Sequence, residues 1–165
     1  MKIMIGNDHG GFAVKGPIVE RLKDLGHEVI DVGCHSEAIV RYPHYARKVA
    51  GAVARGEADR GILLCSTGIG MSVAANKVRS IRAALVTSTT MARMTRRHND
   101  SNVLCLGGRI TGLFELLDIV ETWLAHDYEG GRHAISLGLI DAWEQEVGLG
   151  VPDDIDLPVN EKGAS

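Results

Sequence analysis

The sequence has little of three features that would mark particular classes of protein: long apolar runs, an excess of one charge, and paired cysteines. No apolar stretch approaches the about 20 residues that a membrane-spanning helix needs. The formal net charge is only −3, so no strong field favours nucleic acid or a membrane surface as a partner. Residues 1–6 begin like a strand and not like a signal peptide, and we therefore expect a cytoplasmic protein.

The cysteines are few and form no CxxC pair. Cys34, Cys65 and Cys105 are odd in number, which argues against both a disulfide framework and a zinc site. Any chemistry that they perform is that of a free thiol. Aromatic residues are also scarce, with two Trp and two Phe, so aliphatic side chains must supply most of the core, as in a parallel sheet covered by helices.

Short aliphatic runs alternate along the chain with longer amphipathic stretches. Strands are predicted at residues 2–5, 28–32, 61–65, 82–87 and 102–106, and helices at 12–25, 45–55, 71–76, 89–97, 113–126 and 137–147. This alternation predicts an α/β fold: a Rossmann-like, doubly wound, five-stranded parallel sheet with helices on both faces. We expect one domain at residues 1–148, followed by an acidic tail at 149–165 that is extended or disordered.

Cys65 ends an uninterrupted apolar run, residues 61–65, and leads directly into a glycine-hinged turn. The turn comprises Ser66, Thr67, Gly68, Ile69 and Gly70. Parallel sheets bind ligands at the carboxyl ends of their strands, where backbone amides of such a turn can hold an oxyanion. The functional interpretation is a thiolate nucleophile or base, and the structural alternative is an inert buried cysteine.

Polar residues follow two other strands at the same expected edge. Asp8 and His9 follow the first strand, and Arg109 follows the fifth. A dinucleotide-binding GxGxxG motif that began at Gly6 would require glycine where Asp8 stands, so nicotinamide binding is disfavoured. An Asp-His pair suits acid-base chemistry or phosphate binding, although a helix cap beside a surface histidine would look the same.

Two further segments carry histidine and arginine outside the strand ends. His98 and Asn99 fall between a predicted helix and the following strand, where a solvated polar loop is the structural alternative. Arg132 and His133 follow two glycines, and this hinged turn presents two potential cations suited to phosphate.

Taken together, these motifs resemble one family, the type B ribose-5-phosphate isomerases and galactose-6-phosphate isomerases. The resemblance runs in order from residue 1 to about residue 143 and rests on residues 6–12, 26–31, 42–46, 65–72, 74–77, 82–85, 98–104 and 129–133. It implies a Rossmann-like enzyme that interconverts an aldose phosphate and a ketose phosphate without metal or cofactor. Ribose 5-phosphate and ribulose 5-phosphate are the expected pair, and the expected assembly is a homodimer, with a tetramer as the alternative, whose active sites are shared between subunits.

The resemblance also implies a role for each matching residue. Cys65 would be the base that moves a proton between C1 and C2 through a cis-enediolate held by amides of the turn. His98 would open the sugar ring, assisted by Asp8 and Thr67. The expected substrate-binding residues are His9, Ser66, Gly68, Ile69, Gly70, Asn99, Arg109, Arg132, Arg41 and Tyr42.

Three positions depart from the family pattern. Arg41 stands where the family usually has Asp, Ser136 replaces a second phosphate-binding arginine, and Ser66 replaces a glycine. We expect Arg41 and Ser136 to reshape the pocket. The alternative substrate is therefore a different tetrose, pentose or hexose, with or without a phosphate. A binding module that has lost turnover and a thiol redox protein using Cys65 are the rival interpretations.

Overall fold

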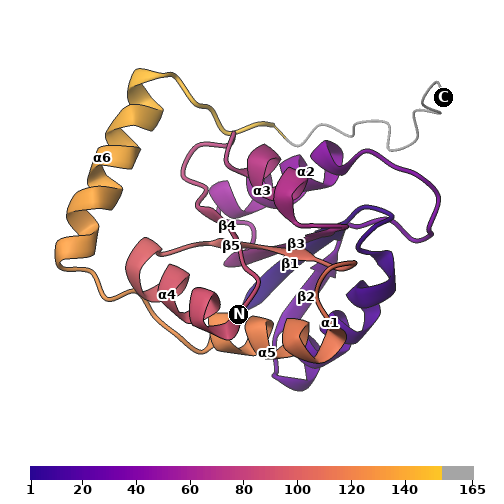
Figure 1. The fold of residues 1–165 in the computed structure, drawn as a ribbon. Coiled ribbons are helices and arrows are strands. Elements are labelled where there is room, and N and C mark those ends of the chain that lie inside the picture. Colours follow the sequence, from indigo (N-terminus) through magenta and orange to yellow (C-terminus); the bar gives the residue numbers. More distant parts are fainter. Residues whose placement is uncertain (154–165) are drawn as a thin grey trace.

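The computed structural model describes residues 1–153, and these form a three-layer α/β sandwich (Figure 1). Within them, five parallel strands make one sheet in the order β2-β1-β3-β5-β4, as the sequence predicts. The strands are β1 (Lys2–Asn7), β2 (Glu28–Asp31), β3 (Arg60–Cys65), β4 (Ala83–Leu85) and β5 (Val103–Gly107). The helices are α1 (Phe12–Asp24), α2 (Tyr42–Ala54), α3 (Ile69–Ala75), α4 (Thr89–Asn99), α5 (Leu113–Leu124) and α6 (Arg132–Glu146).

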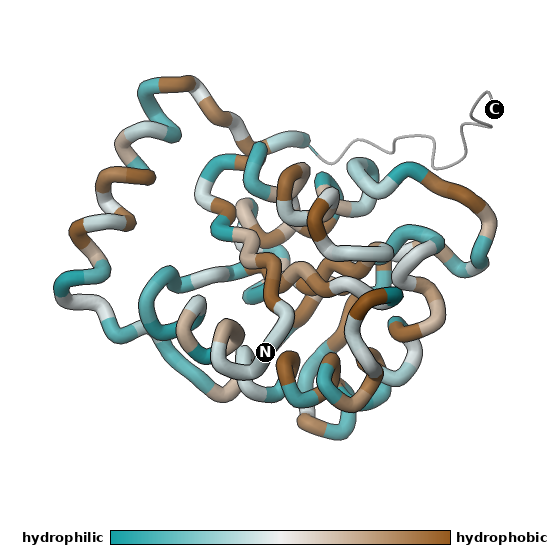
Figure 2. Tube along the Cα trace, in the orientation of Figure 1, coloured by the Kyte–Doolittle hydropathy of each residue, from teal (hydrophilic) through white to brown (hydrophobic). Residues whose placement is uncertain are grey.

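Alternate side chains of the buried strands face opposite layers of helices. Ile5 and Leu64 belong to the core that includes residues of α1, α4 and α5, whereas Met4 and Leu63 belong to the core that includes residues of α2 and α3. Both sets are fully or almost fully buried. The hydropathy trace accordingly shows apolar segments along the central strands (Figure 2). Burial on both faces explains why these strands read as continuous aliphatic runs.

The strand order creates a switch point between β1 and β3. From β1 the chain passes to β2 on one side, and from β2 it crosses back to β3 on the other side of β1. The connections that leave β1 and β3 therefore diverge at the carboxyl ends of these strands, which is where open α/β sheets bind ligands. The Asp8 and Cys65 turns lie at this position.

Several helices are longer than the sequence predicts. Helix α2 begins at Tyr42, three residues before the predicted start, because Pro43 is well tolerated in a first turn. Helix α4 continues through Asn99, so His98 and Asn99 lie on a helix end and not in the expected connection. Helix α6 begins at Arg132, not at residue 137, and strand β4 is shorter than expected.

Helix α6 stands away from the sheet and is mostly exposed (Figure 1). Of its residues, Leu137 and Glu144 are buried, and Glu144 Oε2 accepts a hydrogen bond from the Ser80 amide at 2.8 Å. Its exposed side chains include large apolar ones: Ile135, Leu139, Ile140 and Trp143.

The chain after α6 returns to the body of the domain. The Gly150 carbonyl accepts a hydrogen bond from the Arg79 amide at 3.0 Å, and the Pro152 carbonyl accepts one from Arg55 at 2.7 Å. The rest of the expected acidic tail, residues 154–165, lies outside the described residues. Among residues 1–153, no helix is both long and apolar enough to cross a membrane.

Candidate active site

The Cys65 thiol lies inside a turn of backbone amides at the carboxyl end of β3. Its side chain is almost fully buried, and its Sγ accepts a hydrogen bond from the Gly68 amide at 3.0 Å. Gly68 has φ +78°, and a Cβ there would lie 2.6 Å from Leu85 Cδ1. Only glycine fits this position, which fixes the turn and with it the orientation of the sulfur. Ile69 donates its amide to Thr67 Oγ1 at 3.4 Å, so the hydroxyl belongs to the same turn.

Asp8 lies in the neighbouring turn at the end of β1. Its Oδ1 accepts hydrogen bonds from the amides of Gly10 at 2.8 Å and Gly11 at 3.3 Å. Burial raises the pKa of the Asp8 carboxyl above its usual value, opposed by these amides and by nearby His9 and Arg109. A Cβ on Gly10 would lie 2.7 Å from the Ser66 amide nitrogen, so the two turns pack directly against each other.

Three further predicted residues border these turns. Arg109 follows β5, and its amide donates to the Ser66 carbonyl at 3.1 Å while its side chain is exposed. His9 is half-buried, and its Nδ1 accepts a hydrogen bond from the Val40 amide at 3.4 Å. A Cβ on Gly70 would lie 2.9 Å from the Tyr42 ring, so Tyr42 packs against the start of α3. Arg41, the residue before Tyr42, is exposed.

The remaining predicted residues lie at the opposite edge of the sheet. Helix α4 connects the carboxyl end of β4 to the amino end of β5, so His98 and Asn99 at its end lie near the amino ends of the strands. Arg132 begins α6 after α5, which returns to the same edge. Within residues 1–153, one chain therefore does not bring His98, Asn99 or Arg132 to Cys65.

Glu129 and His133 surround His98 at this second edge. The His98 and His133 rings stack with centroids 4.1 Å apart and planes 12° from parallel. Glu129 Oε2 lies 3.6 Å from His98 Nε2 and 3.9 Å from His133 Nε2. A hydrogen bond from Arg97 lowers the pKa of Glu129, and burial lowers that of His133, helped by His98 and Arg132. Sequence reasoning gave Glu129 no role, although it directly precedes the hinge that drew attention to Arg132.

The ligand atoms of His98, Glu129 and His133 all lie within 4.8 Å of one another, close enough to consider a metal ion. The stacked rings oppose this, because one ion cannot lie in the planes of two nearly parallel imidazoles 4.1 Å apart. Arg97 also pairs with the carboxylate. The three side chains fit a polar network better than a chelate.

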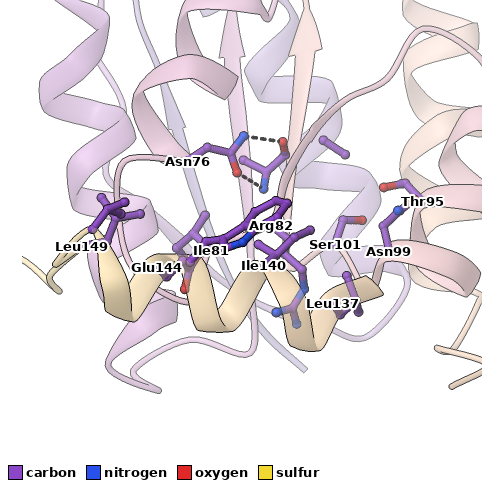
Figure 3. Close-up of a pocket in the computed structure, with 14 residues that line it drawn as sticks. Asn76, Ile81, Arg82, Thr95, Asn99, Ser101, Leu137, Ile140, Glu144 and Leu149 are labelled. Carbon is purple, nitrogen blue, oxygen red and sulfur yellow. Dashed lines mark hydrogen bonds between the residues drawn. The ribbon is translucent and has the colours of Figure 1, made fainter. Parts of the chain in front are cut away.

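A groove separates α6 from the body of the domain (Figure 3). It encloses about 430 Å³, and Asn99 lines it together with Leu137, Ile140 and Trp143 of α6. On its opposite wall the Asn76 side-chain amide bonds to both backbone groups of Ala83. The groove is mainly apolar and holds none of the Cys65 turn, so it is not the chemical centre.

At the switch point of the parallel sheet, a thiol, a carboxyl group and cations surround an amide-lined turn. This arrangement defines an α/β protein with a site for a small polar molecule. The ribose/galactose isomerase family model matches residues 3–140. The chain belongs to this family and is an aldose-ketose isomerase.

Similar proteins cover nearly the whole described chain. Ribose-5-phosphate isomerase B of Escherichia coli is 50% identical over 144 residues, which are 87% of this chain and 97% of the relative. The structure of ribose-5-phosphate isomerase B from Clostridium thermocellum is 54% identical with a TM-score of 0.88, covering 89% of this chain and 99% of that one. The Mycoplasma genitalium enzyme with bound ribulose-5-phosphate is 40% identical with a TM-score of 0.84, covering 88% and 97%.

Proposed function

We propose that this chain interconverts ribose 5-phosphate and ribulose 5-phosphate, with residues 1–148 as the isomerase domain, and that it acts in the cytoplasm. The observation that carries the proposal is the Cys65 sulfur, held by the Gly68 amide in a turn that packs against the Asp8 turn. The similarity to the enzymes from Escherichia coli and Mycoplasma genitalium supports the choice of substrate.

In the proposed reaction, the Cys65 thiolate removes the proton from C2 of the open-chain aldose. The C2–H electrons form the C1–C2 double bond, and the carbonyl oxygen at C1 takes the negative charge of a cis-enediolate. Amides of residues 66–70 stabilise this charge. Cys65 then returns its proton to C1, and transfer of the proton from the O2 hydroxyl to O1 completes the ketose. Asp8 and Thr67 border this position and are suited to the oxygen-to-oxygen transfer.

Phosphate binding is assigned to His9, Arg109 and Arg132, and contact with the sugar to Asn99. A phosphate fixed by several cations supplies binding energy that orients the reacting carbons against the thiolate. Tyr42 and Arg41 border the same turn, where they can contact the sugar or its phosphate.

We further propose that two copies of the chain complete each active site. His98, Asn99 and Arg132 lie at one edge of the sheet and Cys65 at the other, so a second copy must bring the two sets together. The exposed apolar side chains of α6 provide a surface for such an assembly, since a projecting helix of this composition is seldom left in water. Sedimentation should give twice the chain mass, or four times for a tetramer, and a monomer that turns over sugar would contradict this proposal.

The function is tested by assaying purified protein, without added metal, on a panel of tetrose, pentose and hexose phosphates and their free sugars. Cys65→Ala should lower turnover by about 100-fold or more. Cys105→Ala is the matched control, because Cys105 is a fully buried thiol on the neighbouring strand whose pKa burial strongly raises. Full activity of the Cys65 variant would remove the proposed base, and silence of wild type across the panel would favour a binding module.

A further inference from the structure

The two carboxylate oxygens of Glu129 have different neighbours. Oε1 accepts a hydrogen bond from Arg97 Nε at 2.5 Å, which anchors the side chain on one side. Oε2 faces the two stacked imidazoles, 3.6 Å from His98 Nε2 and 3.9 Å from His133 Nε2. The Glu129 amide also donates to the Arg97 carbonyl at 2.9 Å, so backbone and side chain are both tied to the end of α4.

His133 closes the other side of His98. It lies in the first turn of α6, four residues after Glu129, and its ring covers the His98 ring at 4.1 Å. His98 is the next-to-last residue of α4, where an imidazole without neighbours could rotate about both side-chain torsions. A ring on one face and a carboxylate at its Nε2 edge remove most of that freedom.

We propose that Glu129 is a positioning residue that holds the His98 imidazole in the orientation required for ring opening, with His133 as the supporting face. The proposal rests on the role proposed for His98. Opening an aldofuranose removes the proton of the anomeric hydroxyl, breaks the bond between C1 and the ring oxygen, and delivers a proton to that oxygen. In this step His98 takes the anomeric proton, is a cation while the bond breaks, and then gives the proton to the ring oxygen. The facing carboxylate of Glu129 stabilises that cation.

The test uses the fact that only one of the two sugars needs ring opening. Ribose 5-phosphate closes to a furanose through its C4 hydroxyl, whereas ribulose 5-phosphate carries its phosphate on the hydroxyl that would close a furanose and is therefore open-chain. A residue that acts through His98 thus supports turnover of ribose 5-phosphate. Turnover of ribulose 5-phosphate can proceed without it, because the open-chain aldose product closes in solution.

Glu129→Gln keeps the size of the side chain and removes its charge. We expect kcat for ribose 5-phosphate to fall about 10-fold with KM within about twofold, while ribulose 5-phosphate turnover stays near wild type. Glu129→Asp, which keeps the charge, should recover part of the loss. Glu121→Gln is the matched control, because Glu121 makes a similar pair with Arg21 at 2.6 Å between α5 and α1.

Each other outcome overturns the proposal in an identifiable way. Equal losses with both sugars would make the role of Glu129 merely structural. Wild-type kinetics of Glu129→Gln, together with loss of ribose 5-phosphate turnover in His98→Ala, would show that His98 needs no positioning by Glu129. Full ribose 5-phosphate turnover in His98→Ala would instead refute the proposed function of His98 itself.

Discussion

At the residue scale, Asp8 combines a structural cost with a proposed function. Burial raises the pKa of its carboxyl, so the charged form is disfavoured in the folded chain even though two amides bind it. The folded state holds the Asp8 proton more tightly than the unfolded state does. The carboxyl therefore costs no stability at pH values well below its unfolded pKa. The cost grows as the pH rises and is complete above the folded pKa. Such a cost is typical of groups kept for chemistry.

Asp8→Asn should separate these two effects. The amide oxygen can still accept from Gly10 and Gly11, but the buried charge is gone, so the variant should be more stable than wild type near pH 7. The difference should shrink towards zero at about pH 3, where the wild-type carboxyl is protonated in both states. Turnover should fall about 10-fold or more. Denaturant unfolding across this pH range measures the first effect, and a difference that does not change with pH would contradict it.

Arg41 is the residue at which a change of substrate preference can be tested. It is exposed and immediately precedes Tyr42, whose ring packs against Gly70 of the proposed site. Arg41→Asp introduces the residue type that the family resemblance leads us to expect here, and it exchanges a cation for an anion beside the proposed site. We expect KM for phosphorylated sugars to rise severalfold and their ranking to change, since charge-assisted contacts to phosphate are among the stronger polar interactions. Unchanged Michaelis constants and ranking would leave Arg41 without a role in specificity.

At the element scale, the join between β3 and α3 depends on Gly68. Gly68→Ala adds the cost of a left-handed backbone, about 1 kcal/mol, and a Cβ that meets Leu85 and the Leu106 backbone. Gly56→Ala is the matched control, because Gly56 has φ +74° and its Cβ would meet nothing within 4 Å. Both variants should lose stability, but only Gly68→Ala should lose most of its turnover. Equal turnover in the two variants would show that the amide turn does not support the reaction.

The elements that carry the site differ in how well the sequence could predict their positions. Asp8, Cys65 and Arg109 could be placed together, because each ends or follows an aliphatic strand and parallel strands end at one edge. The start of α6 could not be placed, since its apolar residues surround the helix without a period and suggest no face for packing. The stacking of His133 on His98 also depends on the path between α5 and α6, which no local pattern specifies.

At the scale of the whole molecule, the proposed machinery is divided between two edges of one sheet. Residues around Cys65 occupy the carboxyl edge, and the network of His98, Glu129 and His133 occupies the end of α4 near the amino edge. Neither half contains all the proposed groups for binding and chemistry. The shared-site assembly that we propose would account for this division and also for the exposed apolar residues of α6.

Mixed assemblies provide the decisive prediction at this scale. Cys65→Ala and His98→Ala chains should each be inactive on ribose 5-phosphate, but a dimer containing one of each has one site with both changes and one without either. After equal amounts are mixed and the subunits exchange, half of the dimers are mixed, so about a quarter of wild-type turnover should return. Cys65→Ala mixed with Asp8→Ala is the matched control: both changes affect the same half, so every site keeps one defect and activity should stay low. No recovery in the first mixture, under conditions in which exchange is demonstrated by mass, would mean that each chain builds its active site alone.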